Sequence, residues 1–404
     1  MNFFVFSELE AASWFYHLET LRQALVEKER DGVLNAYTGL FRALSQTGAE
    51  NLVTAVAEAL LYQETTLSKA LAEGADVPAG LTVAAQQDLE QVLTFIHRDW
   101  HNEACRVLGR SLPPPKDLAA ENSDERLQDL IATLKKDDPI WLLSVLTEAY
   151  KQHGAGLLAK YKAFRWVDNA LEGIAHPVEI RLEKLVGLER QLAQLKQNTL
   201  TFLRRFPAQH TLLYGPRGSG KSTAIRGLLP LYEAAGLRLI EVSVQDLTAL
   251  PDILEHLRNR PHFYILFVDD LSFEGNDSAY HPLKTLLEGS LIERPTNILI
   301  YASSNRRHLV KEQFSDRPDP LNDDVHGWDT HNERLALADR FGLTITFPSA
   351  TQQRYLELVA GLAAFEGIKG EGLEEKAIRF ADWGNGYSGR TAQQFIDALK
   401  ADLV

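Results

Sequence analysis

The segment GPRGSGKS at 215–222 constrains the fold of this 404-residue chain more than any other stretch of its sequence. It matches the pattern G-x-x-x-x-G-K-[S/T], which places a phosphate-binding loop between a buried strand and a helix. The apolar run TLLY precedes the segment, and residues 222–235 form a plausible helix after it. The alternative, a glycine-rich turn with an incidental lysine, is disfavoured by these flanking elements.

The residue types of this segment suit a nucleoside triphosphate. Gly218 and Gly220 allow the backbone to curl so that successive N–H groups point at phosphate oxygens, and the following helix adds the positive end of its dipole. Lys221 can reach the β and γ phosphates, and the hydroxyl of Ser222 can bind Mg²⁺. We therefore expect ATP and Mg²⁺ as cofactors. The expected nucleotide contacts of the loop are Gly215, Pro216, Arg217, Gly218, Ser219, Gly220, Lys221, Ser222 and Thr223.

Short apolar runs continue after the loop, at 237–242, 263–268, 297–302 and 343–347, with helical segments between them. Buried strands that alternate with helices indicate a parallel sheet covered on both faces. Apolar residues at three- and four-residue spacing predict helices before and after this region. The predicted organisation is an all-helical N-terminal domain at 1–180, an α/β ATP-binding core at 181–348 and a small helical C-terminal lid at 349–404.

Two adjacent acids end the apolar strand at 264–268. The carboxylate of Asp269 would emerge beside the phosphate loop and hold the metal through its water shell. Asp270 then lies where a base would orient an attacking water. The alternative for Asp270 is a charge or a cap at a helix N-terminus.

Three further polar residues follow or precede predicted elements. Asn305 comes after the strand at 297–302, at the edge where open α/β sheets bind ligands, and can hydrogen-bond the γ-phosphate or the lytic water. Arg340 stands directly before the fifth strand, and Arg390 opens the last helix. Arginines at such places stabilise the transition-state charge of phosphoryl transfer.

These elements resemble an AAA+ module in their order: LVG at 185–187, GPRGSGKS, FVDD, SSN, DRFG and GYSGRT. The resemblance implies that Asn305 is sensor 1, that Arg390 is sensor 2, and that Arg340 is an arginine finger acting on a neighbouring subunit's nucleotide. It also implies a ring-like or helical oligomer.

The sequence differs from the usual AAA+ pattern at Asp270, because most AAA+ ATPases have Glu at that position. Asp is one methylene shorter, so we expect either slow hydrolysis or a differently placed water, with Glu274 as a substitute base. Adenine selection would come from apolar and backbone contacts around Val186 and Gly187.

A closer similarity is to a bacterial AAA+ family called domain of unknown function 815. It is carried by VDDLSFE, YASSNRRHL, DRFGL and SGRTAQQF, and by AFRW at 163–166, and it covers residues from about 160 to 404. This similarity implies the fold and names no substrate.

The composition of the chain restricts which classes of partner it can bind. A formal net charge of -13 argues against a surface that coats nucleic acid or anionic lipid, because such binding needs clustered Lys and Arg. The single cysteine, Cys105, cannot form an internal disulfide. Apolar stretches long enough to span a membrane are absent from the sequence, and Glu8 and Glu10 interrupt its start. We expect a cytoplasmic protein with no membrane partner.

The expected function is hydrolysis of ATP to ADP and phosphate, coupled to remodelling of a protein or nucleic-acid partner. The alternatives are a non-hydrolysing ATP-dependent switch or scaffold, and a P-loop kinase. A GTPase is disfavoured because the guanine-reading element [NT]-K-x-D is absent. The long polar segment at 306–338 suggests either a partner or substrate loop with Trp328 as its anchor, or a disordered insertion without a function.

His97 and His101 stand at i and i+4 on one helical face and could bind a metal. A third ligand is not evident in the sequence, so a metal site is disfavoured here.

Overall fold

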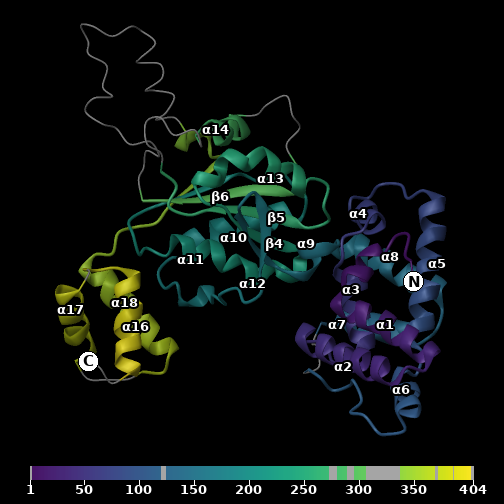
Figure 1. Cartoon of the computed structure of the whole chain (residues 1–404). Coiled ribbons are helices and arrows are strands. Elements are labelled where there is room, and N and C mark those ends of the chain that lie inside the picture. The colour runs from purple at the N-terminus through teal and green to yellow at the C-terminus, as the bar shows by residue number, and fades with distance from the viewer. Residues whose placement is uncertain are drawn as a thin grey trace, which may run out of the picture. The chain divides into compact units, whose positions relative to one another are not determined.

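A computed structural model describes residues 2–119, 124–272, 280–288, 295–305, 337–368, 372–384 and 386–401. The chain forms two compact units (Figure 1). Unit 1 comprises Met1–Lys160 and Asn259–Pro261, and unit 2 comprises Tyr161–Arg258 and His262–Val404. The predicted domain boundaries at 180 and 348 stay predictions.

Unit 1 is built from helices, and the first eight of them share one apolar core. They are α1 (Ser13–Glu27), α2 (Arg30–Thr47), α3 (Leu52–Tyr62), α4 (Thr66–Ala72), α5 (Ala79–Ile96), α6 (Trp100–Leu108), α7 (Glu125–Leu134), α8 (Pro139–His153) and α9 (Gly156–Lys160). Side chains of Asn51, Asp99 and Asp138 accept backbone N–H bonds at the starts of α3, α6 and α8. These caps explain where the helices begin. The predicted N-terminal helical region is present.

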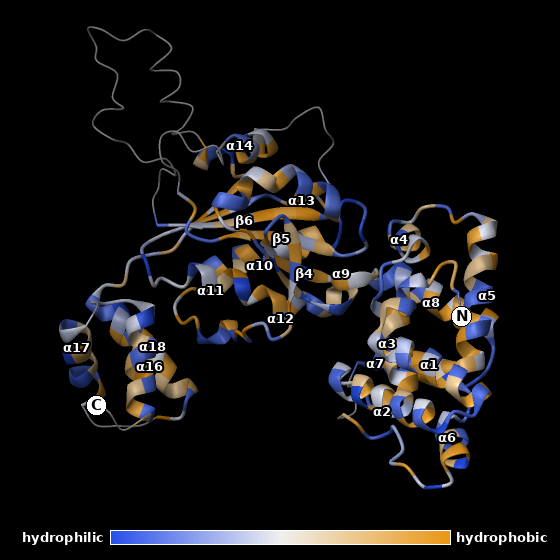
Figure 2. Cartoon of the chain, in the orientation of Figure 1, coloured by the Kyte–Doolittle hydropathy of each residue, from blue (hydrophilic) through white to orange (hydrophobic). Residues whose placement is uncertain are grey.

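Unit 2 contains a seven-stranded sheet with the order β2-β1-β4-β5-β6-β3-β7. Its strands are β1 (Ala163–Val167), β2 (Ala170–Ile174), β3 (Thr211–Tyr214), β4 (Leu237–Glu241), β5 (Phe263–Val268), β6 (Ile298–Ser304) and β7 (Leu343–Thr346). Every neighbouring pair is parallel except β1 and β2. All residues of β5 and β6 are buried, and Figure 2 shows both strands as hydrophobic. The predicted parallel sheet is confirmed.

The expectation of helices alone up to residue 180 is wrong at 163–174, where β1 and β2 form a hairpin. Asp168 and Asn169 make its two-residue turn with φ values of 49° and 63°. Turns with positive φ at both central residues favour Asn, Asp and Gly, so this dipeptide was the available signal. Neither AFRWV nor ALEGI alternates strictly between apolar and polar residues, so the strand pattern was not visible in the sequence.

Helices cover both faces of the sheet (Figure 1). On one side lie α10 (Glu189–Leu203), α11 (Lys221–Arg226) and α12 (Leu228–Tyr232), and on the other α13 (Leu250–Leu257) and α14 (Tyr280–Glu288). The helix predicted at 222–235 is divided at Gly227. A Cβ atom at this glycine would lie 2.3 Å from Cδ2 of Leu182, so the close approach requires glycine.

A helical C-terminal part follows β7, as predicted. It consists of α16 (Gln352–Phe365), α17 (Leu373–Trp383) and α18 (Gly389–Lys400), which we call the lid helices. Tyr355, Val359, Phe395 and Ile396 are buried in a core of their own. Within the described ranges of the chain, no helix combines the length and the apolar character needed to cross a membrane.

Candidate nucleotide-binding site

The phosphate loop predicted from the sequence lies between the end of β3 and the start of α11. A Cβ atom at Gly215 would lie 2.4 Å from the backbone oxygen of Phe347, so only glycine lets the loop pass this close to the end of β7. Gly218 has a φ of 71°, and a Cβ atom there would lie 3.1 Å from the side chain of Ser388. Local geometry therefore requires glycine at both positions.

Lys221 is buried at the start of α11 and makes three hydrogen bonds. Its Nζ donates to the backbone oxygens of Gly215 at 2.7 Å and Pro216 at 2.8 Å, and to Oδ1 of Asn305 at 2.8 Å. Burial lowers the pKa of Lys221, although the charges of Asp269 and Asp270 oppose this shift. A partly desolvated ammonium above a curled loop suits a phosphate oxygen.

Asp269 directly follows β5, and hydrogen-bond donors surround its carboxylate. Oδ1 accepts from Oγ of Ser222 at 2.6 Å, from Oγ of Ser303 at 2.6 Å and from the backbone nitrogen of Asp270 at 3.1 Å. Oδ2 lies 3.3 Å from Nη2 of Arg226. The structure thus brings together the hydroxyl and the carboxylate that the sequence predicts for Mg²⁺. Mg²⁺ commonly binds to such a pair together with phosphates and water.

Asp270 and Asn305 form a second contact of the site. Nδ2 of Asn305 donates to Oδ1 of Asp270 at 2.6 Å, while Oδ1 of Asn305 accepts from Lys221. The other carboxylate oxygen of Asp270 lies 3.8 Å from Nη2 of Arg217, and the Asp270 side chain is 58% exposed. The carboxylate of Asp270 therefore faces the phosphate loop and solvent.

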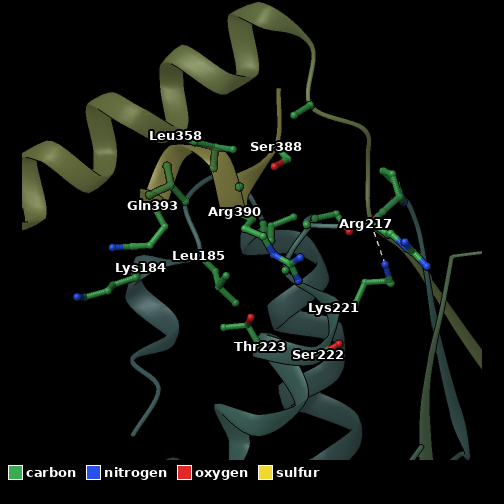
Figure 3. Close-up of a pocket in the computed structure, with 18 of the residues that line it drawn as sticks. Lys184, Leu185, Arg217, Lys221, Ser222, Thr223, Leu358, Ser388, Arg390 and Gln393 are labelled. Carbon is green, nitrogen blue, oxygen red and sulfur yellow. Dashed lines mark hydrogen bonds between the residues drawn. The ribbon is translucent and has the colours of Figure 1, made fainter. Parts of the chain in front are cut away.

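The lid helices meet the phosphate loop at the start of α18. The backbone nitrogen of Gly389 donates to the oxygen of Gly218 at 3.0 Å. The side chain of Ser388 caps α18 by accepting from the backbone nitrogen of Thr391 at 3.1 Å. Figure 3 shows Arg390 in the same pocket as Lys221 and Ser222.

These elements enclose a pocket of about 970 Å³. The loop, the segment at 178–188 and the lid helices line it, with apolar contributions from Leu185, Val186 and Leu358. Ser219 has a buried Oγ that makes no hydrogen bond to the described residues, so a donor remains for a phosphate oxygen. The size of the pocket and its mixture of apolar and cationic lining suit a nucleotide.

Gly187 is absent from the described residues that line the pocket, whereas Val186 belongs to them. The backbone oxygen of Gly187 accepts a hydrogen bond from Nη2 of Arg354 in α16, and its nitrogen donates to Oε1 of Glu189 at 3.0 Å. Its φ of 69° explains why glycine is found there. Gly187 therefore connects the core to the lid helices, and its predicted contact with adenine stays a prediction.

Other predicted residues lie elsewhere. Arg340 is half-buried in a short 3₁₀ turn (Ala338–Arg340) before β7 and is not among the described residues that line the pocket. Glu274 lies outside the described residues, as do residues 306–336 of the predicted insertion, including Trp328. Their predicted roles stay predictions.

The suggested histidine pair does not converge on one point. Nε2 of His97 lies 2.9 Å from the backbone oxygen of Leu134, whereas Nδ1 of His101 lies 2.7 Å from the hydroxyl of Tyr37. Across the described ranges, no group of three or more His, Cys, Asp or Glu side chains is placed to hold a metal. The two histidines thus have separate hydrogen-bond partners.

Ser303 and Arg226 also contact Asp269, and neither has a role predicted from the sequence. Ser303 is the last residue but one of β6, which lies next to β5, so its position at the carboxyl edge of the sheet was a usable signal. Arg226 lies one helical turn after Ser222, so the i, i+4 spacing placed it on the same face of α11. Neither residue belongs to the phosphate-loop pattern.

Residues 159–403 match a family whose description is protein of unknown function (DUF815). The chain belongs to this family. Its α/β core has a mostly parallel sheet with flanking helices and a phosphate loop between β3 and α11. None of the curated proteins matches the chain.

Solved structures of one bacterial protein are also similar to the chain. The RuvB Holliday junction branch migration motor of Thermotoga maritima is 15% identical, with 55% of this chain and 72% of that chain covered and a TM-score of 0.33. An arginine-to-alanine variant of it is 15% identical over 54% and 71% of the two chains, with a TM-score of 0.33. A threonine-to-valine variant is 16% identical over 55% and 72%, again with a TM-score of 0.33.

Proposed function

We propose that the chain binds Mg-ATP in this pocket and hydrolyses it to ADP and phosphate. The observation that carries the proposal is the convergence of Lys221, the Ser222–Asp269 pair and the Asp270–Asn305 pair at one end of the sheet. A chain of hydrogen bonds joins them: Lys221 donates to Asn305, Asn305 donates to Asp270, the backbone nitrogen of Asp270 donates to Asp269, and Ser222 donates to Asp269. These residues come from three separate elements. Their types are those that phosphoryl transfer needs: a cation, a metal-binding hydroxyl and carboxylate, and a carboxylate base with an orienting amide.

Each residue has a definite part in this proposal. The loop backbone and Lys221 bind the phosphates, and Ser222 and Asp269 hold Mg²⁺, which neutralises phosphate charge when bound. Asp270 accepts a proton from the attacking water. Asn305 hydrogen-bonds both that water and Asp270, and so orients them relative to each other. Arg390 contributes positive charge from the lid helices. Val186 contacts the adenine of the nucleotide.

The first test is ATP binding by a Lys221→Met variant. Removing a charge-assisted hydrogen bond costs about 1.5–3 kcal/mol, so ATP affinity should fall by roughly tenfold to a hundredfold, and hydrolysis should be lost. Calorimetry or fluorescent-nucleotide titration measures the affinity, and phosphate release measures the activity.

A suitable control is Lys162→Met, which removes another lysine of unit 2 whose Nζ pairs with Glu233 at 2.7 Å. This control should bind ATP as the unmodified protein does. Unchanged ATP binding by a folded Lys221→Met variant would contradict the proposal.

A switch without hydrolysis is the second candidate, and the shorter side chain of Asp270 favours it. Asp270 is also engaged by Asn305 and Arg217 in this structure. Tight ATP binding with no phosphate release at high protein concentration would identify the switch. Transfer of labelled γ-phosphate to a small molecule would instead identify a kinase.

The proposed work of the ATPase is remodelling of a protein or nucleic-acid partner by a self-associated form in the cytoplasm. Support comes from the AAA+ fold and from the separate helical unit 1. Arg340, which lies outside the pocket lining of its own chain, is proposed to act on the nucleotide of a neighbouring copy.

A further inference from the structure

Arg226 bridges two carboxylates at the end of the sheet. Its Nη2 lies 3.3 Å from Oδ2 of Asp269 and 3.0 Å from Oε1 of Glu241. Glu241 ends β4 and Asp269 follows β5, and these two strands are neighbours. Because Arg226 belongs to α11, its guanidinium joins the carboxyl ends of two strands to the helix after the phosphate loop.

The surroundings of Arg226 restrict its side chain. Its Cζ lies 5.2 Å from the centroid of the Phe267 ring, a distance suited to a cation–π contact. Phe267 and Glu241 are paired in register across β4 and β5. The guanidinium is therefore held by a ring and by an acid, each placed by the sheet.

The two oxygens of Asp269 have different partners. Oδ1 accepts from the hydroxyls of Ser222 and Ser303 and from one backbone N–H group. Among the described residues, Oδ2 has Arg226 as its hydrogen-bond partner. Rotation about the last side-chain bond of an aspartate has a low energy barrier. The charge-assisted hydrogen bond from Arg226 to Oδ2 therefore restricts the rotation of the Asp269 carboxylate.

We propose that Arg226, held by Glu241, is a positioning residue that fixes the carboxylate of Asp269 toward Ser222 and thereby sets the affinity of the site for Mg²⁺. The inference rests on the proposed function, since it requires Mg-ATP in the pocket. Groups that orient metal-binding side chains typically change metal affinity by about 10- to 100-fold when removed. The negative charge of Glu241 would offset the positive charge that Arg226 brings to a metal-binding carboxylate.

The test is a Mg²⁺ titration at a fixed ATP concentration with the full chain and its Arg226→Gln variant. The Mg²⁺ concentration for half-maximal hydrolysis should rise about tenfold or more in the variant. ATP binding in the presence of EDTA should be unchanged, and saturating Mg²⁺ should restore most of kcat. A general loss of structure would instead weaken ATP binding with and without Mg²⁺.

Two further variants keep the proposal testable if Arg226→Gln folds poorly. Arg226→Lys keeps the charge without the planar fork and should give a smaller shift in the same direction. Glu241→Gln removes the acid that holds the guanidinium and should also raise the Mg²⁺ requirement. Arg22→Gln in α1, which removes an arginine paired with Glu19 at 2.6 Å, is the matched control and should titrate like the unmodified protein.

The possible results separate this inference from the proposed function. If the unmodified protein shows no Mg²⁺-dependent ATP binding or hydrolysis, the proposed function fails. If it does show them and the Arg226 and Glu241 variants keep the same Mg²⁺ requirement, only the positioning role fails. A lower Mg²⁺ requirement in Arg226→Gln would overturn it too, because the arginine would then act by charge repulsion.

Discussion

Asn305 shows how one side chain can join two charged groups of opposite sign. Its amide oxygen accepts from Lys221 and its amide nitrogen donates to Asp270. An amide is well suited to both roles, because a carboxylate has no proton to donate to Asp270. The amide oxygen of Asn305 therefore faces the cationic side of the site, and its amide nitrogen faces the acidic side.

Replacing this amide should affect hydrolysis more than binding. Asn305→Ala removes one preorganised contact to the reacting groups, and such a loss typically lowers kcat by about 100- to 1,000-fold. ATP affinity should change much less, since Lys221 keeps both of its backbone acceptors. Separate measurements of kcat and of the dissociation constant check this.

Asn305→Asp places a second carboxylate against Asp270 and should reduce kcat at least as much as Asn305→Ala. If both variants keep the activity of the unmodified protein, Asn305 has no part in the reaction.

The residues of the site differed in how readily the sequence predicted them. The phosphate loop was predictable because its residues are consecutive and each type follows from phosphate chemistry. Asn305 and Asp269 were predictable because parallel strands end at one edge of a sheet. Arg226 and the turn of Gly187 toward Arg354 were not, because both depend on contacts between elements that sequence periodicity does not specify.

At the scale of elements, the lid helices are attached to the α/β core through several polar contacts. Glu366 follows α16, and its carboxylate lies 2.7 Å from Nζ of Lys184 and 2.6 Å from Nζ of Lys400. Hydrogen bonds from these two lysines lower the pKa of Glu366 to about 2. Lys184 also lines the pocket, so this ion pair connects the lid to the site.

Glu366→Gln should therefore lower the Tm at pH 7 and speed the release of bound ADP. A carboxyl group with a lowered pKa stabilises the fold above its unfolded pKa of about 4.3, and this contribution is lost as the pH falls toward 2. The difference in Tm between the two proteins should be constant above about pH 5 and shrink below it.

Glu357→Gln, on the exposed face of α16, provides the control and should change neither the Tm nor ADP release. Equal behaviour of the two variants would show that the contacts of Glu366 do not hold the lid.

At the scale of the whole molecule, self-association should appear in the kinetics. If Arg340 acts on the nucleotide of a neighbouring copy, the specific ATPase activity should rise with protein concentration. Adding folded Arg340→Ala protein to the unmodified protein should lower the activity by more than simple dilution. Phosphate release at several mixing ratios measures this, and a specific activity independent of concentration would count against an arginine finger.

The hairpin β1–β2 has a practical consequence for dividing the chain. β4 has β5 on one side and β1 on the other, and β1 is in turn covered by β2. A fragment that begins at residue 181 lacks both strands and leaves the N–H and C=O groups of β4 open along a sheet edge. Exposed edges of this kind pair with other chains, so such a fragment would aggregate even with every residue of the phosphate loop present.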